Sequence, residues 1–81
     1  MPVVTLYGKP GCHLCDEARA AVERVRAERP FELREVDVSI DPVLNRRFGE
    51  RIPVVEIDGE EAFELGFDAD ELEERLGTVG E

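Results

Sequence analysis

Apolar and polar residues change their spacing along the chain, and each change marks the edge of an expected element. Residues 3–7 (VVTLY) are almost uninterrupted β-branched, aliphatic and aromatic side chains, which predicts a strand buried on both faces of a sheet. Residues 9–11 (KPG) break this run. Apolar residues then recur on one side of a helix that Pro30 ends, namely Leu14, Ala18, Ala21, Val22 and Val25.

A second strand and a second helix follow. Residues 31–38 (FELREVDV) roughly alternate between apolar and polar positions. Because a helix separates them from the first strand, we expect the two strands to pair in parallel through a right-handed crossover. Asp41 and Pro42 suit the N-cap and the first position of a helix. Leu44 and Phe48 share one face of this short helix.

The next segment predicts a hairpin. Asp58-Gly59 suits the positive φ angles of a tight turn. The β-rich residues on either side, 54–57 and 62–65, are therefore expected to pair as antiparallel strands.

A third helix is expected over residues 69–76. Asp68 with Glu71 three residues later resembles a capping box, and Gly77 is a stop signal. The expected order of elements is therefore β-α-β-α-β-β-α.

The chain is short and strongly acidic. Its 81 residues are expected to form one domain over 1–77, followed by a frayed tail at 78–81. The formal net charge is −10, and most of the excess lies in residues 58–81, where Arg75 is the only basic residue. Such a surface repels phosphates and anionic headgroups, so neither nucleic acid nor a membrane is an expected partner. The acidic end is either a solvated helix face or a docking surface for a basic partner.

Cys12 and Cys15 are the only cysteines, and two residues separate them. As a structural disulfide they would close a very short loop, which restrains the unfolded chain little. A zinc site would need two further ligands, and His13 is the only histidine, although two chains could share a cluster. The third alternative is a working redox pair.

The position of this pair at the start of the first helix favours redox chemistry. Residues three apart on a helix share a face, with Cα atoms about 5 Å apart, within the range that a disulfide allows. Free N–H groups at the helix start favour a thiolate at Cys12. Cys12 is therefore the expected nucleophile. Cys15, deeper in the helix and beside Asp16, is the expected resolving thiol.

This Cys-x-x-Cys, opening the first helix after a buried strand, resembles the thioredoxin superfamily, and TLYGKPGCHLC is similar to its glutaredoxin-like branch. The resemblance implies an α/β thioredoxin-like fold of glutaredoxin size. Its mixed four-stranded sheet would have the third strand antiparallel to the others and helices on both faces. The resemblance also implies a cis bond between Ile52 and Pro53, which turns the Ile52 backbone toward a substrate beside Cys12.

The chain departs from the family at the positions that contact glutathione. Residues 51–53 (Arg-Ile-Pro) stand where typical glutaredoxins have Thr-Val-Pro, and Leu65 replaces the first glycine of a pair that lets glutathione approach the backbone. Amides near Phe67 and Asp68, at the start of the third helix, are still placed to bind a carboxylate. Whether glutathione or a flavoprotein disulfide reductase is the reductant therefore stays open.

The sequence predicts a monomeric, cytoplasmic thiol–disulfide oxidoreductase without a bound cofactor or metal. We expect a cytoplasmic location because the sequence has no recognisable signal peptide. It also has no apolar stretch of about 20 residues, the length needed to span a bilayer. The substrate would be a disulfide-containing protein or a small thiol compound. The expected site residues are the catalytic Cys12 and Cys15 and the substrate-binding Lys9, Ile52, Pro53, Phe67 and Asp68.

Two alternatives stay open beside this prediction. The first is a non-catalytic module that carries a metal or an iron–sulfur cluster to a partner protein. The second is an inert glutaredoxin-like interaction domain. The roles of two neighbours of the thiol pair also stay open. Lys9 could favour the Cys12 thiolate, bind an anionic substrate, or be an exposed loop residue. His13 could contact Cys12 or face solvent.

Overall fold

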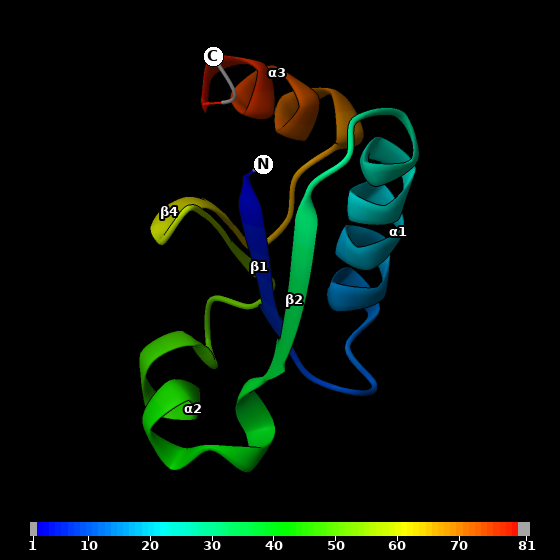
Figure 1. The fold of residues 1–81 in the computed structure, drawn as a ribbon. Coiled ribbons are helices and arrows are strands. Elements are labelled where there is room, and N and C mark those ends of the chain that lie inside the picture. Colours follow the sequence, from blue (N-terminus) through cyan, green and yellow to red (C-terminus); the bar gives the residue numbers. More distant parts are fainter. Residues whose placement is uncertain (1, 80–81) are drawn as a thin grey trace.

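The described residues, 2–79, fold into four strands, three α-helices and one short 3₁₀ helix, in the order expected from the sequence (Figure 1). The structure is a computed structural model. Along the chain the elements are β1 (Val3–Gly8), α1 (His13–Glu28), β2 (Glu32–Asp37), η1 (Val38–Ile40), α2 (Pro42–Phe48), β3 (Val54–Ile57), β4 (Glu60–Glu64) and α3 (Ala69–Val79).

The strands form one mixed sheet in the order β2-β1-β3-β4. β1 pairs in parallel with β2, in a register that places Leu6 opposite Glu35 and Gly8 opposite Asp37. β3 runs antiparallel to both β1 and β4. The predicted mixed sheet, with its third strand antiparallel to the others, is confirmed.

Helices cover both faces of the sheet, as predicted, but unequally. α1 and α3 cover one face, and the short α2 packs only at one end of the other. Along β1, Val4 and Leu6 are therefore buried, whereas Val3, Thr5 and Tyr7 on the opposite face are only half-buried. The expected burial of the first strand on both faces is wrong. The larger core consists of Val4, Leu6, Ala18, Val22, Val25, Phe31, Val55, Ile57, Leu72 and Leu76.

The buried face of α1 differs from the prediction at Leu14, which is exposed, and at Ala21, which is only half-buried. Leu14 is 46 % exposed, and Cys15 takes its place in the core with 1 % exposure. The reason is helical geometry, because steps of three, four and three residues from Cys15 follow one face, and Leu14 lies about 100° away from it. The members of this face are Cys15, Ala18, Val22 and Val25.

The hairpin forms where it was predicted, but β4 begins at Glu60, two residues earlier than expected. Asp58 (φ 51°) and Gly59 (φ 87°) both have positive φ. This two-residue turn fits the twist of the flanking strands, so Ile57 pairs directly with Glu60.

The third helix extends further than predicted. α3 continues past Gly77 to Val79, so the expected stop at Gly77 is wrong. A glycine inside a helix costs only about 1 kcal/mol relative to alanine, which does not by itself end a helix. Of the frayed tail expected at 78–81, the first two residues belong to α3, and residues 80–81 lie outside the described residues.

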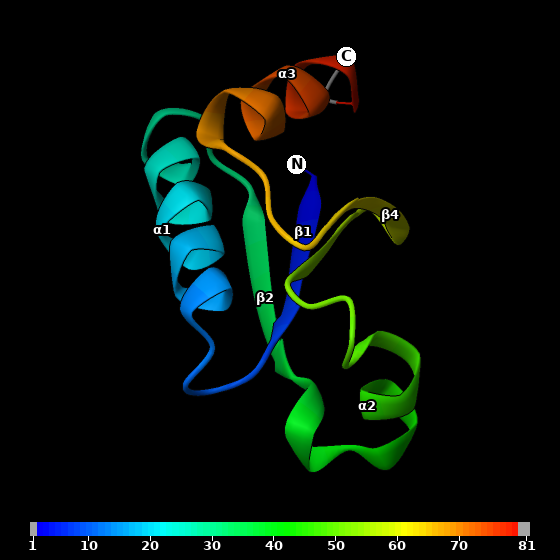
Figure 2. The same cartoon turned by 180° about the vertical axis from the view of Figure 1, so that it is seen from behind.

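The two ends of the sheet have different surroundings (Figures 1 and 2). The loop before α1 and helix α2 lie at the end where β1 and β2 finish, whereas α3 lies at the opposite end. At the first of these ends Asp41 caps α2 as predicted, accepting hydrogen bonds from the N–H groups of Val43 at 2.9 Å and Leu44 at 3.3 Å. Within the described part of the chain, none of the helices has the length and apolar character needed to cross a membrane.

Candidate active site

Cys12 occupies the N-cap position of α1, immediately before the first helical residue. Gly11, with φ 78°, leads the chain into this cap in a conformation that residues with a side chain rarely adopt. The half-buried Cys12 Sγ accepts a hydrogen bond from the Cys15 N–H at 3.3 Å. The sulfur therefore lies at the positive end of the helix dipole, as the sequence predicts.

Cys15 lies one turn inside α1 and is almost completely buried. A β-carbon at Gly8 would lie 3.0 Å from the Cys15 Sγ, so the absence of a side chain there lets β1 approach the sulfur closely. Both cysteines are free thiols. The buried side chains that share a cluster with Cys15 are Val38, Phe48, Ile52 and Val54.

The two thiols differ in acidity. The pKa of Cys12 is lowered, chiefly by a hydrogen bond from the Cys15 thiol, which opposes the effect of burial. Backbone N–H groups of Cys15 and Leu14 and the charge of Lys9 lower it further. Burial raises the pKa of Cys15 to about 11, and the hydrogen bond to Cys12 adds to this rise. The predicted order of acidity is confirmed. Of the two predicted reasons, the depth of Cys15 and its neighbour Asp16, the first is the main one, because burial is the largest cause of the raised pKa.

Alanine at position 8 should press its methyl group against the Cys15 sulfur. Overpacking a filled core costs about 1–3 kcal/mol, and we expect Gly8→Ala to lower the free energy of unfolding of the reduced protein by this amount in chemical denaturation. The control is Gly77→Ala, where a β-carbon would lie in ordinary contact, 3.5 Å from Arg29 Nη1. This control substitution should raise the free energy of unfolding by up to about 1 kcal/mol. Equal stabilities of the wild type and Gly8→Ala would contradict the close approach.

Lys9 and His13 lie on either side of Cys12 in the sequence, and they differ in their effect on the Cys12 thiol. Lys9 is exposed, and its charge lowers the pKa of Cys12. The His13 side chain is 89 % exposed, and its Nε2 lies 3.9 Å from Glu17 Oε2. His13 therefore faces solvent, and the substrate-binding role of Lys9 stays a prediction.

The peptide bond between Ile52 and Pro53 is cis, as the resemblance implies. Both side chains are buried, and Ile52 packs in the cluster that contains Cys15 and contacts Cys12. Outside the regular elements, no backbone–backbone hydrogen bond of Ile52 is found in the described part of the chain. The site therefore has an unpaired backbone segment close to the thiols.

Phe67 and Asp68 lead into α3. The Phe67 ring stacks on Phe63 with 5.1 Å between centroids. Asp68 and Glu71 form the predicted capping box, in which the Glu71 N–H donates to Asp68 Oδ1 at 2.8 Å and the Asp68 N–H donates to Glu71 Oε1 at 3.1 Å. The Asp68 amide is thus occupied by a carboxylate of the chain itself, and substrate binding by these two residues stays a prediction.

The turn before α3 has a backbone path suited to glycines. Leu65 has φ 62° and Gly66 has φ 127°. The Leu65 N–H donates to the Arg51 carbonyl at 3.0 Å, and the Leu65 side chain is 55 % exposed. Leucine therefore occupies a left-handed backbone position where typical glutaredoxins have glycine.

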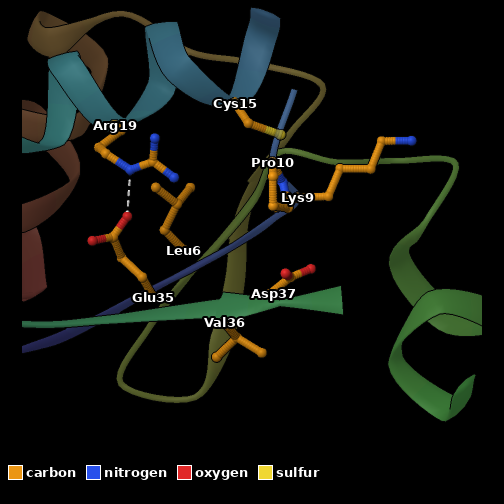
Figure 3. A pocket seen from close by; sticks show the side chains of 9 residues that line it. Leu6, Lys9, Pro10, Cys15, Arg19, Glu35, Val36 and Asp37 are labelled. Carbon is orange, nitrogen blue, oxygen red and sulfur yellow. Dashed lines mark hydrogen bonds and ion pairs between the residues drawn. The ribbon is translucent and has the colours of Figure 1, made fainter. Parts of the chain in front are cut away.

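A cavity of about 460 Å³ lies between α1 and the parallel strands, and sequence reasoning missed it (Figure 3). Arg19 of α1 forms an ion pair with Glu35 of β2 at its edge, with 2.5 Å between Nε and Oε1. Alternation along the second strand places Glu35 and Asp37 on one face, but only the register with β1 shows that this face is covered by α1. The lining residues are Leu6, Gly8, Lys9, Pro10, Cys15, Arg19, Glu35, Val36 and Asp37.

The potential for metal binding is limited by the ligands that the fold brings together. In the region from residue 2 to residue 79, no group of three or more His, Cys, Asp or Glu side chains is placed to hold a metal ion. Cys12 and Cys15 supply two of the four ligands that a structural zinc site requires. The arrangement is better suited to exchange between a thiol pair and a disulfide.

Comparison with known proteins relates the sequence to a glutaredoxin-like family and the fold to solved thioredoxin-like structures. Residues 3–77 match the model of a family described as glutaredoxin-like domain (DUF836). An uncharacterised protein of Mycobacterium tuberculosis, Rv0508, is 32 % identical over 65 residues, which cover 74 % of this chain and 67 % of that protein.

Solved structures share the fold. The protein XcR50 from X. campestris is 33 % identical with a TM-score of 0.79, covering 93 % of this chain and 96 % of that one. Protein Ne2328 from Nitrosomonas europaea is 26 % identical with a TM-score of 0.76, covering 91 % and 89 %. A thioredoxin from Halobacterium salinarum, 22 % identical, has a TM-score of 0.76 over 99 % of this chain and 75 % of that one. The predicted α/β thioredoxin-like fold is confirmed.

Proposed function

Because the chain belongs to the glutaredoxin-like domain family, we propose that it is a dithiol–disulfide oxidoreductase with Cys12 as nucleophile and Cys15 as resolving thiol. One observation carries the proposal, namely that an acidified sulfur at the N-cap of α1 lies beside a buried thiol one turn along the same helix. Purely structural cysteines do not require such a difference in acidity. Family membership supports a redox role in general, and enzymatic turnover goes beyond it.

The proposed reaction has two thiol–disulfide exchange steps. The Cys12 thiolate attacks one sulfur of a substrate disulfide and forms a mixed disulfide, while the other substrate sulfur leaves as a thiolate and takes a proton from water. Cys15 loses its proton, attacks the Cys12 Sγ and forms the Cys12–Cys15 disulfide, which releases the second substrate thiolate. The substrate gains two electrons and the protein loses two.

The oxidised protein then needs an external reductant, and we propose either glutathione or a flavoprotein disulfide reductase. The substrate is a disulfide-containing protein or a small thiol compound. The unpaired Ile52 backbone beside Cys12 suits an extended peptide, which can pair with it like an added strand. Lys9 and the backbone near Phe67 and Asp68 would contact the substrate from other sides. The protein would act as a monomer, without a bound cofactor, in the reducing cytoplasm.

The decisive experiment measures the reduction of insulin or of a small disulfide by the reduced protein, with each of the two reductants supplied in turn. Cys12→Ser removes the nucleophile and retains a good N-cap, because serine is a preferred residue there. We expect turnover by the wild type and only background with Cys12→Ser. Equal inactivity of both proteins with either reductant would refute the proposal.

Leu65→Gly tests which reductant is used. Leucine in a left-handed backbone position costs of order 1 kcal/mol relative to glycine, so this variant should be at least as stable as the wild type in denaturation. Removal of the exposed side chain should also open the approach to the backbone. We expect the rate with glutathione to rise severalfold relative to the rate with a flavoprotein reductase. An unchanged ratio of the two rates would instead favour the flavoprotein.

The alternatives predict different observations. A module that carries an iron–sulfur cluster should absorb visible light after anaerobic purification, whereas the proposed enzyme should be colourless.

An inert fold should have an ordinary thiol at position 12, with a pKa of about 8.5. We expect alkylation of Cys12 by iodoacetamide to reach half its maximal rate at a lower pH than alkylation of an unstructured cysteine peptide. The same midpoint for both thiols would support the inert fold.

A further inference from the structure

The cavity between α1 and β2 reaches Cys15 from the sheet side (Figure 3). Four positions in its wall on β1 and β2 face α1, because Leu6 pairs with Glu35 and Gly8 with Asp37 in the parallel register. Cys15 and Arg19 line the same cavity from α1. The buried thiol therefore has charged neighbours although its own side chain is 1 % exposed.

Arg19 is fixed in position on this cavity. It lies four residues after Cys15 on α1, and side chains with this spacing are neighbours on a helix surface. Its Nε donates to Glu35 Oε1 at 2.5 Å, and its Nη1 donates to Asp16 Oδ1 at 3.2 Å. Contacts on two elements restrict the guanidinium to the side of α1 on which Cys15 lies.

Few other charges face Cys15. These are Cys12 at the N-cap of α1, Asp16 on α1, Glu35 and Asp37 on β2, and Lys9 in the loop between β1 and α1. The Lys9 side chain extends away from Arg19 and Glu35 (Figure 3). The cluster on the other side of Cys15 is apolar apart from Tyr7, whose hydroxyl donates to Glu56 at 2.8 Å.

We propose that Arg19, anchored by Glu35, is a positioning residue for the redox pair, and that its guanidinium stabilises the Cys15 thiolate that forms in the resolving step. The inference rests on the proposed function. In that step Cys15 gives its proton to water, its sulfur attacks the Cys12 Sγ, and the bond between Cys12 and the substrate sulfur breaks. The substrate thiolate leaves with the electron pair of that bond.

The electrostatics agree with this geometry. Burial is the main cause that raises the pKa of Cys15, and two groups act in the opposite direction, first a hydrogen bond from the Lys9 backbone N–H and then, more weakly, the positive charge of Arg19. Glu35 offsets part of that positive charge, so it should oppose the Cys15 thiolate while it holds the guanidinium in place. Arg19 and Glu35 should therefore have opposite effects on the acidity of Cys15.

The test measures the pKa of Cys15 by NMR of its β-carbon in the Cys12→Ser background, where no substrate is needed. An opposite charge nearby favours an ionised thiol, and partial exposure of the pair weakens the effect, so we expect Arg19→Gln to raise this pKa by about half a pH unit. Glu35→Gln should lower it, and Arg19→Lys should leave it close to the starting value. The control is Arg24→Gln, which removes the same charge from an exposed position of α1 and should have no effect.

A second readout follows the resolving step itself. With Cys12 preloaded as a mixed disulfide, Arg19→Gln should release the substrate thiol about twofold more slowly at pH 7, because a smaller thiolate fraction is partly offset by higher nucleophilicity. If the role of Arg19 were merely structural, Arg19→Gln and Glu35→Gln would shift the pKa of Cys15 in the same direction, or would leave it unchanged. Either result would overturn the inference. If the wild type reduces no disulfide, the proposed function fails, and the pKa comparison still decides whether Arg19 sets the acidity of Cys15.

Discussion

A stable mixed disulfide at Cys12 is the expected result when Cys15 is replaced by serine. The first exchange step needs only the Cys12 thiolate, whose N-cap position and hydrogen bond from the Cys15 N–H are retained in Cys15→Ser. The second step loses its attacking sulfur. The adduct with the substrate should therefore accumulate and be visible by mass spectrometry without reductant.

The expected loss of turnover is large. Well-placed intramolecular groups react as if present at very high concentration, far above 1 M in favourable cases. An external thiol at about 1 mM would have to replace Cys15, so we expect turnover of protein disulfides to fall by at least about 10³-fold. Turnover is measured with the insulin assay at a fixed concentration of reductant.

Cys12→Ser is the matched control for the adduct. It should give no adduct, because the remaining Cys15 thiol is buried and its pKa is raised to about 11. Formation of an adduct at Cys15 in this variant would reverse the assigned roles. Undiminished turnover by Cys15→Ser would show that the second thiol is not needed.

Loss of a large part of the folding free energy is expected when Phe48 is replaced by alanine. The Phe48 side chain is 1 % exposed, and its ring stacks on Tyr7 with 4.4 Å between centroids. The guanidinium carbons of Arg47 and Arg51 lie 4.9 Å and 5.3 Å from the centre of the Phe48 ring. Phe48, the last residue of α2, thus holds this helix against the sheet, in the same buried cluster as Ile52.

The magnitude follows from the cavity that the change would leave. Truncation of a buried phenylalanine to alanine costs about 3–5 kcal/mol. A domain of this length has a total stability of roughly 4–12 kcal/mol. Urea denaturation followed by circular dichroism should therefore show a much lower midpoint for Phe48→Ala, or an unfolded protein in the absence of urea.

Leu14→Ala is the control for this second prediction, because it removes an apolar side chain that is 46 % exposed. We expect a loss below about 1 kcal/mol, as for most exposed positions. A loss as large as that of Phe48→Ala would mean that Leu14 packs in the core, as its place in the apolar pattern suggests.

Local signals in the sequence located the elements well. Asp41-Pro42, Asp58-Gly59 and the Asp68–Glu71 box all occur where the structure has a helix start, a hairpin turn and a capping box. Each of these signals states a requirement of a few adjacent backbone groups. Gly77 misled because a helix tolerates one glycine, and β4 begins early because the two-residue turn brings its first residue directly into pairing.

The sequence by itself determined the order of the elements, the helix caps and the placement of Cys12 and Cys15 one turn apart at a helix start. All of these depend on contacts between residues near one another in the chain. Only the tertiary structure decided that Cys15 rather than Leu14 is buried and that Arg19 meets Glu35 beside it. Burial and the pairing of Arg19 with Glu35 depend on the register between strands and helices distant in the sequence, and no local pattern specifies that register.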